Sequence, residues 1–381
     1  MSGPESFTRY FDDLDGHIWL NAASEGPLPL VSRKALEEAI VWKSRPYLLD
    51  IPKFAQVPQK LKTTLGEFFN INSRDIILGN SASYGLHLLA NGLPWDTGDE
   101  ILVMQNDFPT NILPWLALEK KGVVVKQLKP KNFILRPEEL EKAITVKTKL
   151  FCISQVHTFT GLKLDVEQFA AICRKKNVVC VINLSQSAGT MPIDVSQWNV
   201  DAVVCAGYKW LCGPYGTGMA WFSPELRSKL DINLSYWCSV LSDEELQSEG
   251  KLKYREISSA RKYDVFGTAN FFNFVPFESS VRLLLDIGIP KIVNYQKKLV
   301  GHFTKNFDLK KFQLLSSTDP LHQSCLIVIS HQDQSKNKAV FDRLKSANIH
   351  VAFWKGNIRV SPHIYNTIGE IDRCLSVIHH N

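Results

Sequence analysis

Short apolar segments alternate with helical ones through the middle of this 381-residue chain. Helices are expected from Ser81 to about residue 90, over 137–144 and over 166–176. Six apolar segments between them have the length and composition of buried strands: 76–78, 100–105, 123–128, 150–156, 178–184 and 202–206. Strands that alternate with helices at this spacing predict an α/β fold with a mostly parallel sheet wrapped by helices.

The stretch 201–222, DAVVCAGYKWLCGPYGTGMAWF, points most clearly to chemistry. Lys209 follows an apolar strand and precedes a turn rich in glycine and proline, with Tyr208 and Trp210 on either side. Desolvation at such a position lowers the pKa of a lysine and frees its amine for Schiff-base chemistry. The alternative is an ordinary lysine that emerges into solvent, as most lysines do.

A second loop, 79–83 (GNSAS), opens a helix at its small polar residues. Free backbone N–H groups at a helix N-terminus suit a phosphate. Capping of the helix by Ser81 or Ser83 explains the same residues without a ligand. The sequence therefore leaves both interpretations open at this loop.

Two further segments are candidates for ligand contact. Residues 21–27, NAASEGP, follow a short strand at 18–20 and either let the backbone approach a ligand closely or form an ordinary turn. Phe108 is expected at the carboxyl end of a strand, because Pro109 suits the first turn of the helix that follows. That end of the strands is where ligands bind in open α/β sheets.

Prolines and composition locate other elements. Residues 30–69 are helical in pattern with breaks at Pro46 and Pro52, and Pro276 is expected in the first turn of a helix over 277–287. Residues 231–265 are charged and irregular. The C-terminal part is expected to form a compact α/β unit with strands and helices at 325–330, 336–347, 350–354, 358–360 and 368–379.

Composition argues against several classes of function. The net charge is +6, but the basic residues are scattered in short groups at expected helix ends and form no stripe for nucleic acid. The eight cysteines form no CxxC pair, which favours reduced core residues over a disulfide framework or a metal site. The N-terminal residues are polar and acidic, and no apolar run reaches membrane-spanning length. We expect a soluble, cytoplasmic protein that binds neither nucleic acid nor membrane.

Seven short motifs occur in order, each at an expected strand or helix end. They are Asn21-Ala22-Ala23, Asn80-Ser81-Ala82-Ser83, Phe108-Pro109-Thr110-Asn111, Gln186-Ser187-Ala188-Gly189, Tyr208-Lys209-Trp210-Leu211, Gly267-Thr268-Ala269-Asn270 and Arg359-Val360-Ser361-Pro362. With them, nearly the whole chain resembles the class V aminotransferase family of pyridoxal-phosphate (PLP) enzymes, fold type I. That family includes cysteine desulfurases, selenocysteine lyases, kynureninases and isopenicillin N epimerases. The resemblance implies a large PLP domain (30–275) with a seven-stranded sheet, and a small domain made of 1–29 and 276–381.

The resemblance also implies roles for individual residues. Lys209 would carry PLP as a Schiff base and, once displaced by the substrate amine, serve as general base at Cα. Phe108 would stack on the pyridine ring, and Gln186 would hydrogen-bond its phenolic oxygen. The phosphate would be bound at a helix N-terminus and beside the lysine, by Ser81, Ala82, Ser83 and Tyr208.

Other implied roles concern the substrate and a second subunit. His157 lies where relatives place a polar residue that contacts the ring, although a core histidine fits the sequence equally well. Arg359 would bind the substrate carboxylate in a bidentate fork. Gly267 and Thr268 would reach the phosphate from the other subunit, which implies a homodimer with shared active sites. Asn21 and Ala22 are assigned to the substrate side of the site.

Two departures from the family pattern matter for the reaction. Asn183 stands where the family usually has an aspartate that keeps the pyridine nitrogen protonated. A neutral amide lacks that charge, which weakens the cofactor as an electron sink and counts against transamination more than against β-elimination or epimerisation. The interval 350–358 before Arg359 contains no cysteine, and Cys325 and Cys374 lie in an apolar strand and on the last helix, so we reject a persulfide-forming desulfurase.

The function expected from the sequence is therefore a PLP-dependent enzyme acting on a small amino acid through Lys209. A β-elimination lyase that cleaves a C–S or C–C bond is the leading hypothesis. An aminotransferase or an amino-acid epimerase of the same family is the first alternative. A catalytically idle PLP-binding protein, suggested by Asn183, is an alternative of another class.

Overall fold

The computed structural model describes residues 7–131, 134–254, 256–257, 259–267 and 269–380. Its largest element is a seven-stranded sheet with the order β2-β8-β7-β6-β5-β3-β4. The strands are β2 (Ile76–Gly79), β3 (Glu100–Met104), β4 (Val124–Leu128), β5 (Thr148–Ser154), β6 (Val179–Asn183), β7 (Ala202–Ala206) and β8 (Gly218–Phe222). Strands β3 to β7 pair in parallel, whereas β8 is antiparallel to both β7 and β2. The predicted α/β fold with a mostly parallel sheet is confirmed.

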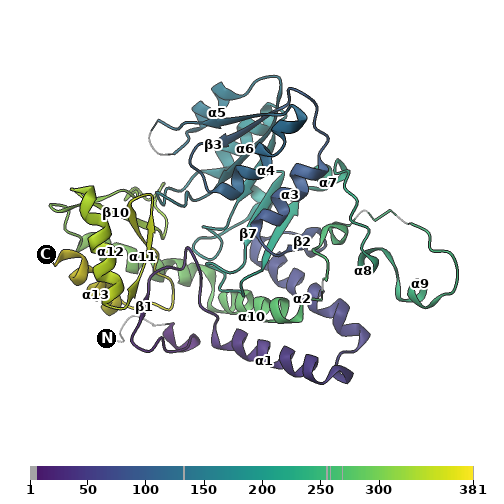
Figure 1. The fold of residues 1–381 in the computed structure, drawn as a ribbon, viewed down its shortest axis with the longest axis horizontal. Helices are drawn as coiled ribbons and strands as arrows, with labels where there is room; N and C mark the ends of the chain where they lie inside the picture. Colours follow the sequence, from purple (N-terminus) through teal and green to yellow (C-terminus); the bar gives the residue numbers. More distant parts are fainter. Residues whose placement is uncertain (1–6, 132–133, 255, 258, 268, 381) are drawn as a thin grey trace.

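Both faces of this sheet are buried under helices (Figure 1). On β7, Val204 packs into one apolar cluster with Leu86 of α3 (Ala82–Gly92), while Val203 packs into a second cluster on the opposite face. The second cluster includes residues of α2 (Ile51–Phe69) and α6 (Val166–Lys175). Strands that are covered on both sides need no polar alternation, which explains their continuous apolar sequence.

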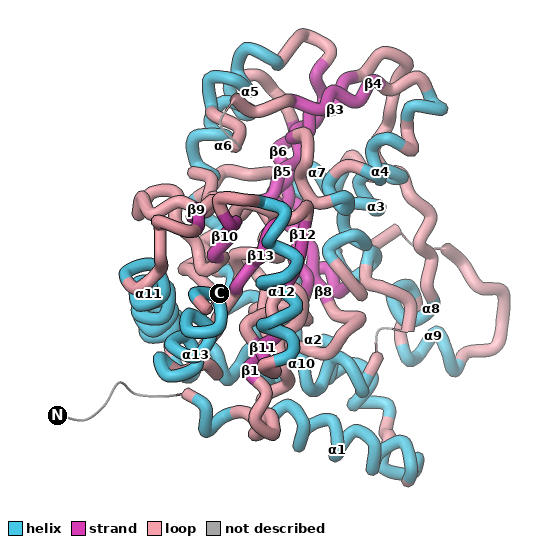
Figure 2. Tube along the Cα trace, turned by 60° about the vertical axis from the view of Figure 1, so that its left-hand side comes forward, coloured by secondary structure: helices cyan, strands magenta, loops and turns pink. Residues whose placement is uncertain are grey.

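The C-terminal part contains a four-stranded antiparallel sheet of order β12-β13-β10-β9. Its elements are α11 (Ile289–Lys305), β9 (Phe312–Leu314), β10 (Ile327–His331), α12 (Asn337–Ser346), β12 (Ala352–Trp354), β13 (Asn357–Val360) and α13 (Ile368–His379). The N-terminal strand β1 (Ile18–Trp19) pairs in parallel with β11 (Ile349–His350), as Figure 2 shows. The sequence predicted these elements except α11 and β9, but the single strand expected over 350–354 is divided into β11 and β12, which belong to different sheets.

Helix α10 (Phe271–Ile287) corrects one expectation: it begins six residues before Phe277, and Pro276 lies inside it. Phe271 packs edge-on against Trp42 and Phe54, with ring centroids 6.1 and 5.2 Å apart. These tertiary contacts extend the helix past a proline that would otherwise disfavour it.

The first helical region also differs from the pattern. Helix α1 (Leu30–Ser44) ends before Pro46 as expected, but Pro52 lies in the first turn of α2, where the missing N–H costs nothing. The proposed division into 30–275 and the remaining segments stays a prediction; its boundary falls within α10, which packs against α1 and α2.

The remaining elements are short. They are α4 (Leu113–Leu116), α5 (Pro137–Ala143), α7 (Pro224–Ser228), α8 (Trp237–Val240), α9 (Asp243–Gln247), and the 3-10 turns η1 (Thr8–Tyr10), η2 (Pro46–Leu48), η3 (Ser73–Asp75), η4 (Pro109–Asn111), η5 (Glu119–Lys121), η6 (Val195–Gln197), η7 (Ala260–Tyr263) and η8 (Gln334–Lys336). Helices α8 and α9 belong to an arm, residues 236–254, that extends away from the body in Figure 1.

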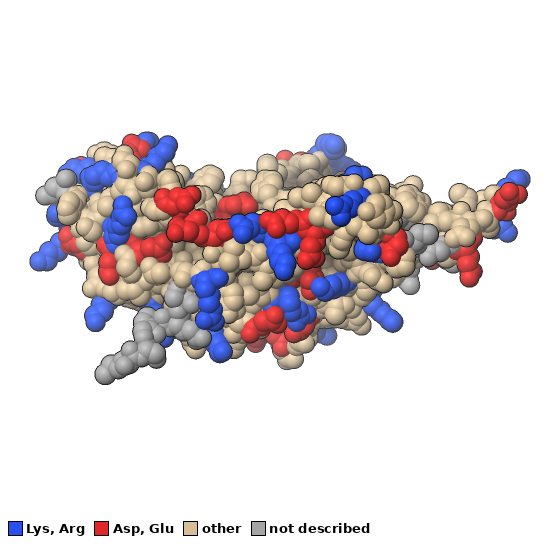
Figure 3. Space-filling model, turned by 90° about the horizontal axis from the view of Figure 1, so that it is seen from below, with Lys and Arg blue, Asp and Glu red and all other residues tan. Residues whose placement is uncertain are grey.

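The molecular surface carries mixed charge on the face seen in Figure 3, where lysine and arginine side chains lie among aspartate and glutamate. Within the described ranges, no helix has the length and apolar character needed to cross a bilayer.

A buried ion pair fixes the start of the sheet near the loop 79–83. Lys62 Nζ lies 2.7 Å from Asp264 Oδ2 with both side chains at least 93% buried, and Asp264 Oδ1 accepts from the Leu78 N–H at 2.8 Å. We expect Lys62→Met to lower the free energy of unfolding by about 3 kcal/mol, because it leaves a buried carboxylate unpaired. Denaturant titration measures this.

The matched control is Lys229→Met, which removes the exposed pair with Glu225 at 3.1 Å. We expect this surface change to cost less than about 0.5 kcal/mol. Equal losses for the two variants would contradict the role assigned to the Lys62–Asp264 pair.

Candidate active site

Lys209 lies just beyond the carboxyl end of β7 and is 8% exposed. The N-terminal loop crosses directly over its backbone, where the Gly26 N–H donates to the Tyr208 carbonyl at 2.8 Å. A Cβ at Gly26 would stand 2.1 Å from the Lys209 carbonyl oxygen. Only glycine permits this approach, so the segment 21–27 is held against the lysine by backbone contact.

The Lys209 amine lies in a dry and electropositive place. Burial, followed by the Arg359 cation, lowers its pKa from 10.5 to about 8, while Cys205 and Glu25 act weakly in the opposite direction. Burial also raises the pKa of Glu25 to about 7. Nζ lies 5.2 Å from the centre of the Phe108 ring and 6.0 Å from that of Tyr208. A substantial fraction of the amine is therefore neutral, and nucleophilic, near pH 8.

A cavity opens beside this amine at the carboxyl ends of the parallel strands. Its lining residues are Ser81, Ala82, Ser83, Phe108, Thr110, Ser154, Thr158, Asn183, Ser185, Gln186, Ala206, Tyr208 and Lys209. These residues follow β2, β3, β5, β6 and β7, so five strands contribute to one site. This is the position at which open α/β sheets bind ligands.

One end of the cavity is rich in hydrogen-bond donors. Ser81 caps α3, its Oγ accepting from the Tyr84 N–H at 3.3 Å, and the Ser83 and Thr110 hydroxyls hydrogen-bond each other. Gly218 allows β8 to approach, because a Cβ there would lie 2.6 Å from the Ser81 backbone. An eleven-residue helix that points its N-terminus at hydroxyl groups attracts an anion.

Two amide side chains line the opposite part of the cavity. Gln186 donates from Nε2 to the Ala23 carbonyl at 3.0 Å and accepts from Trp210 Nε1 at 2.9 Å. Asn183 donates from Nδ2 to Asn111 Oδ1 at 2.8 Å. Both amides are held in one orientation by these partners, which makes their remaining hydrogen-bonding positions available to a ligand.

Arg359, on β13, brings a second buried cation to the site. Its side chain donates from Nη1 to the Thr158 carbonyl at 3.3 Å and from Nη2 to Ser24 Oγ at 2.8 Å, while Nε is buried without a partner. No carboxylate pairs with it within the described residues. Burial lowers its pKa to about 10. A buried guanidinium with open donors is suited to an anionic ligand.

Asn21 and Ala22 support this region without lining the cavity. The Ala22 N–H donates to the Ser361 carbonyl at 3.1 Å, and Asn21 forms a bridge with the same residue. Asn21 Oδ1 is buried without a hydrogen-bond partner. The loop therefore joins the N-terminal segment to β13 and places Ser24 against Arg359.

Two predicted residues do not line the cavity, and a third lies outside the described residues. His157 does not line the cavity: Nε2 lies 2.9 Å from the Asn106 carbonyl and Nδ1 lies 2.8 Å from Thr160 Oγ1, so both ring nitrogens have partners. Gly267 is exposed and does not line the cavity of its own chain. Thr268 lies outside the described residues.

Sequence reasoning missed five lining residues: Thr110, Ser154, Thr158, Ser185 and Ala206. All follow or end strands that were predicted, so the rule that ligands meet strand carboxyl ends could have found them. The Thr158 carbonyl also accepts from Arg359, which makes it part of both halves of the site.

The interval before Arg359 forms a β-hairpin between β12 and β13. Lys355 and Gly356 have positive φ angles at its turn, and Lys355 Nζ lies 4.1 Å from the Phe159 ring centre and 3.2 Å from Asn106 Oδ1. The seven cysteines whose side chains are described are free and buried. Burial raises the pKa of the Cys205, Cys325 and Cys374 thiols to about 12. None of the seven is an accessible thiolate.

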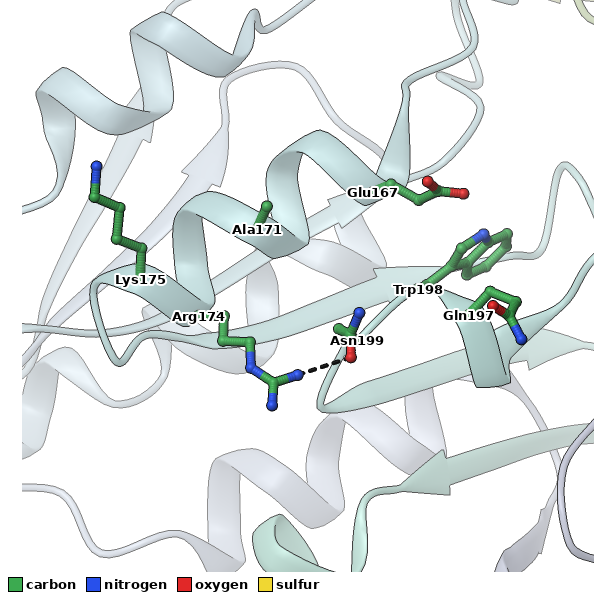
Figure 4. Close-up of a pocket in the computed structure, with 7 residues that line it drawn as sticks. All are labelled: Glu167, Ala171, Arg174, Lys175, Gln197, Trp198 and Asn199. Carbon is green, nitrogen blue, oxygen red and sulfur yellow. Dashed lines mark hydrogen bonds between the residues drawn. The ribbon is translucent and has the colours of Figure 1, made fainter.

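A second hollow lies on the surface between α6 and residues 197–199, where Arg174 donates to Asn199 Oδ1 at 2.7 Å (Figure 4). It contains no buried reactive group, and its residues 197–199 precede the amino end of β7, whereas Lys209 follows the carboxyl end. Among the described residues, no cluster of His, Cys, Asp and Glu has the arrangement of a metal site.

The proximity of the two cations has a measurable consequence. We expect Lys209 in dialysed, ligand-free protein to react with an amine-specific reagent along a pH curve centred near 8, instead of near the ordinary 10.5. Arg359→Gln removes a repelling charge, so the midpoint should move to higher pH. Peptide mass spectrometry follows the modification. Arg282→Gln, on α10, is the control; an Arg359→Gln midpoint equal to this control would contradict the coupling.

Comparisons with known proteins agree with this geometry. The aminotransferase class-V family matches residues 52–374. A probable cysteine desulfurase of Methanothermobacter thermautotrophicus is 24% identical over 388 residues, covering 96% of this chain and 95% of that protein. A solved C-DES variant with glycine covalently linked to its PLP cofactor superposes with a TM-score of 0.88 at 19% identity, covering 98% of this chain and 99% of that one. The structure of the cystine C–S lyase C-DES with its product cysteine persulfide superposes with a TM-score of 0.86 at 20% identity, covering 96% of this chain and 98% of that one. The structural likeness confirms the fold, and because the family match spans most of the sequence, this chain belongs to the aminotransferase class-V family of PLP-dependent enzymes.

Proposed function

We propose that this protein is a PLP-dependent lyase that eliminates a leaving group from Cβ of a small L-amino acid. The observation that carries the proposal is the pair of buried cations, Lys209 and Arg359, neither of which has a carboxylate partner among the described residues. An amino-acid carboxylate would neutralise Arg359 and direct the neighbouring Cα toward the lysine.

The residues that line the cavity fit PLP. The N-terminus of α3 with Ser81, Ala82 and Ser83 would hold its phosphate, assisted by Tyr208. The Phe108 ring would cover the pyridine face, Gln186 would contact the phenolic oxygen, and Asn183 the ring nitrogen. Lys209 would form the covalent link through Nζ. Because His157 has partners at both ring nitrogens, we assign the neighbouring contact to Thr158 instead.

The reaction then depends on the position of protons and charges. Bound PLP supplies an electron-withdrawing group that makes the Cα proton acidic. The lowered pKa of Lys209 leaves its amine able to accept that proton at neutral pH, and Arg359 holds the carboxylate in place. A bond from Cβ to sulfur breaks with its electron pair leaving on the sulfur. A bond from Cβ to an acyl carbon is cleaved after water adds to that carbon, and its electron pair stays on Cβ. None of the seven described thiols takes part in this step.

The described cysteines favour elimination over sulfur transfer to the protein. The relative from Methanothermobacter is named a probable cysteine desulfurase, and C-DES a cystine C–S lyase. Here a hairpin occupies the interval before Arg359, and the seven described thiols are buried. These features support the lyase, in which the sulfur leaves with the substrate fragment.

We further propose a homodimer with shared active sites. Exposed apolar side chains lie on α1, α2 and α10, namely Val31, Ile40, Val41, Phe54 and Phe272. The arm adds Trp237 and Tyr254, both more than half exposed. Gly267 follows this arm and is exposed, which is consistent with Gly267 and Thr268 reaching the phosphate of the partner subunit. Apolar surface of this extent is typical of an interface.

The proposed reaction predicts defined products. With PLP and cystine or cysteine as substrate, we expect pyruvate, ammonia and the released thiol species, with one water consumed. With kynurenine as substrate, we expect alanine and the carboxylic acid that water forms from the acyl group, without ammonia. Lys209→Ala should reduce the rate at least a hundredfold, on the order expected for loss of a general base. Lys120→Ala, an exposed lysine, is the control. Coupled assays of pyruvate and ammonia measure the rate.

Other outcomes identify the alternatives. Consumption of a keto-acid acceptor would indicate an aminotransferase, and loss of optical activity without either product an epimerase. Covalently bound cofactor with no turnover would indicate an idle PLP-binding protein. Absence of a borohydride-reducible link at Lys209 would contradict the enzyme proposal itself.

The shared site predicts complementation between subunits. Thr268→Ala and Lys209→Ala should each give nearly inactive homodimers. A mixed dimer contains two sites, one of which has both native residues, so the isolated mixed dimer should have roughly half of wild-type activity. Co-expression with two affinity tags isolates the mixed dimer. No activity beyond the sum of the two parents would contradict sharing of the site.

A further inference from the structure

A buried carboxylate that has no part in the proposed reaction lies behind the cavity. Asp107, which follows β3, is 3% exposed. Its Oδ1 accepts from the Phe108 N–H at 2.7 Å and from Ser154 Oγ at 2.8 Å. Its Oδ2 accepts from Asn111 Nδ2 at 2.8 Å and from the Ser154 N–H at 2.9 Å. Four donors surround the two oxygens, so this group acts only as an acceptor.

Asp107 is connected to Asn183 through one other amide. Asn111, fully buried, gives one Nδ2 hydrogen to Asp107 and the other to Ser154 Oγ at 2.7 Å. Its Oδ1 accepts from Asn183 Nδ2 at 2.8 Å. Asp107, Asn111 and Asn183 thus form a continuous hydrogen-bonded chain across the carboxyl ends of β3, β5 and β6, which we call the carboxylate–amide relay.

Both ends of the relay fix the direction of its hydrogen bonds. At one end Asp107 can only accept, so Asn111 must turn its NH₂ toward it. At the other end the Ser185 N–H can only donate, and it donates to Asn183 Oδ1 at 2.9 Å. If the Asn183 amide were flipped, its NH₂ would face the Ser185 N–H, so that two donors met. Its oxygen would face Asn111 Oδ1, so that two acceptors met. The orientation of Asn183 is therefore determined by its neighbours.

The relay also carries charge toward Asn183. Asp107 forms no ion pair within the described residues, so its negative charge is compensated mainly by hydrogen bonds. Lys355 and His157 are charged or titratable groups that interact with it at longer range. In a low-dielectric site, hydrogen bonds in series polarise one another. Electron density pushed from Asp107 through Asn111 makes Asn183 Oδ1 a stronger acceptor and its NH₂ a weaker donor.

We infer that Asp107 is a positioning residue that, through Asn111, makes Asn183 a hydrogen-bond acceptor for a protonated pyridine nitrogen of PLP. The inference rests on the proposed function, because it requires PLP in this cavity. An aspartate at position 183 would supply its negative charge directly. Here the charge comes from Asp107, which lies two hydrogen bonds beyond Asn183. The site retains electron-withdrawing capacity despite its neutral amide.

The test is spectroscopic. Holoenzyme loaded with ¹⁵N-labelled PLP should show a ring-nitrogen chemical shift in the protonated range at pH 7. In Asp107→Asn the shift should move toward the unprotonated range, with the titration midpoint of the bound cofactor lowered by about one pH unit, a tenfold loss of protonated form. Asn111→Ala, which keeps Asp107 but interrupts the relay, should have the same direction of effect.

Two controls separate charge relay from general damage. Asp99→Asn changes another buried carboxylate, at the amino end of β3 where Lys149 pairs with it at 3.3 Å, and should leave the shift unchanged. Asn183→Asp places the charge directly at the cavity, so adding Asp107→Asn to it should change the protonated fraction less than about threefold.

The outcomes distinguish this inference from the function on which it rests. If the wild type carries no borohydride-reducible cofactor at Lys209, both the proposed function and this inference are contradicted. A linked cofactor whose ring nitrogen is unprotonated in the wild type overturns the relay alone. So does a protonated nitrogen that is insensitive to both Asp107→Asn and Asn111→Ala. If neither Asp107→Asn nor Asn111→Ala folds, the ring-nitrogen shift of the wild type still tests the inference. A shift in the protonated range, like that of Asn183→Asp, supports it, and a shift in the unprotonated range overturns it.

Discussion

The burial of two neighbouring cations, neither of them in an ion pair with a carboxylate among the described residues, is the constraint on which this site depends. Lys209 and Arg359 repel each other, and both lose hydration, which lowers the pKa of each. Such an arrangement is unfavourable for the isolated site. It persists because a sheet buried on both faces holds Lys209 and a separate antiparallel sheet holds Arg359. An anionic ligand relieves the repulsion, so affinity for anions is built into the fold.

Much of this arrangement could be read from the sequence, because it follows from strand ends. The strand 202–206 has the predicted bounds, and the rule that ligands meet carboxyl ends placed Phe108, Asn183 and Lys209 in one region. That rule does not say which side chain of a loop faces the ligand. Beyond a strand, successive side chains still point in different directions: Thr158 lines the cavity, whereas His157, which the resemblance placed at the ring, does not.

Other features depend on contacts between distant segments and have no local signal. Pro276 suggested a helix start, but packing of Phe271 on α1 and α2 moved the start forward. The direction of the Asn183 amide is set by Asn111, 72 positions earlier, and by the Ser185 N–H. Sequence shows which residue stands at position 183. Only the three-dimensional network shows whether that residue presents an oxygen or a nitrogen. The helix α11, by contrast, has regularly spaced apolar residues and could have been predicted.

The partners of Arg359 suggest how substrate binding and the architecture are linked. Its guanidinium contacts Ser24 of the N-terminal loop and the carbonyl of Thr158 after β5, while its own strand, β13, belongs to the C-terminal sheet. Three segments thus meet at one cation, and Gly26 of the same N-terminal loop touches the Lys209 backbone. A carboxylate bound at Arg359 would strengthen a junction that already includes the lysine. If Arg359 binds the substrate carboxylate as proposed, recognition of the substrate and placement of the Lys209 amine are parts of the same set of contacts.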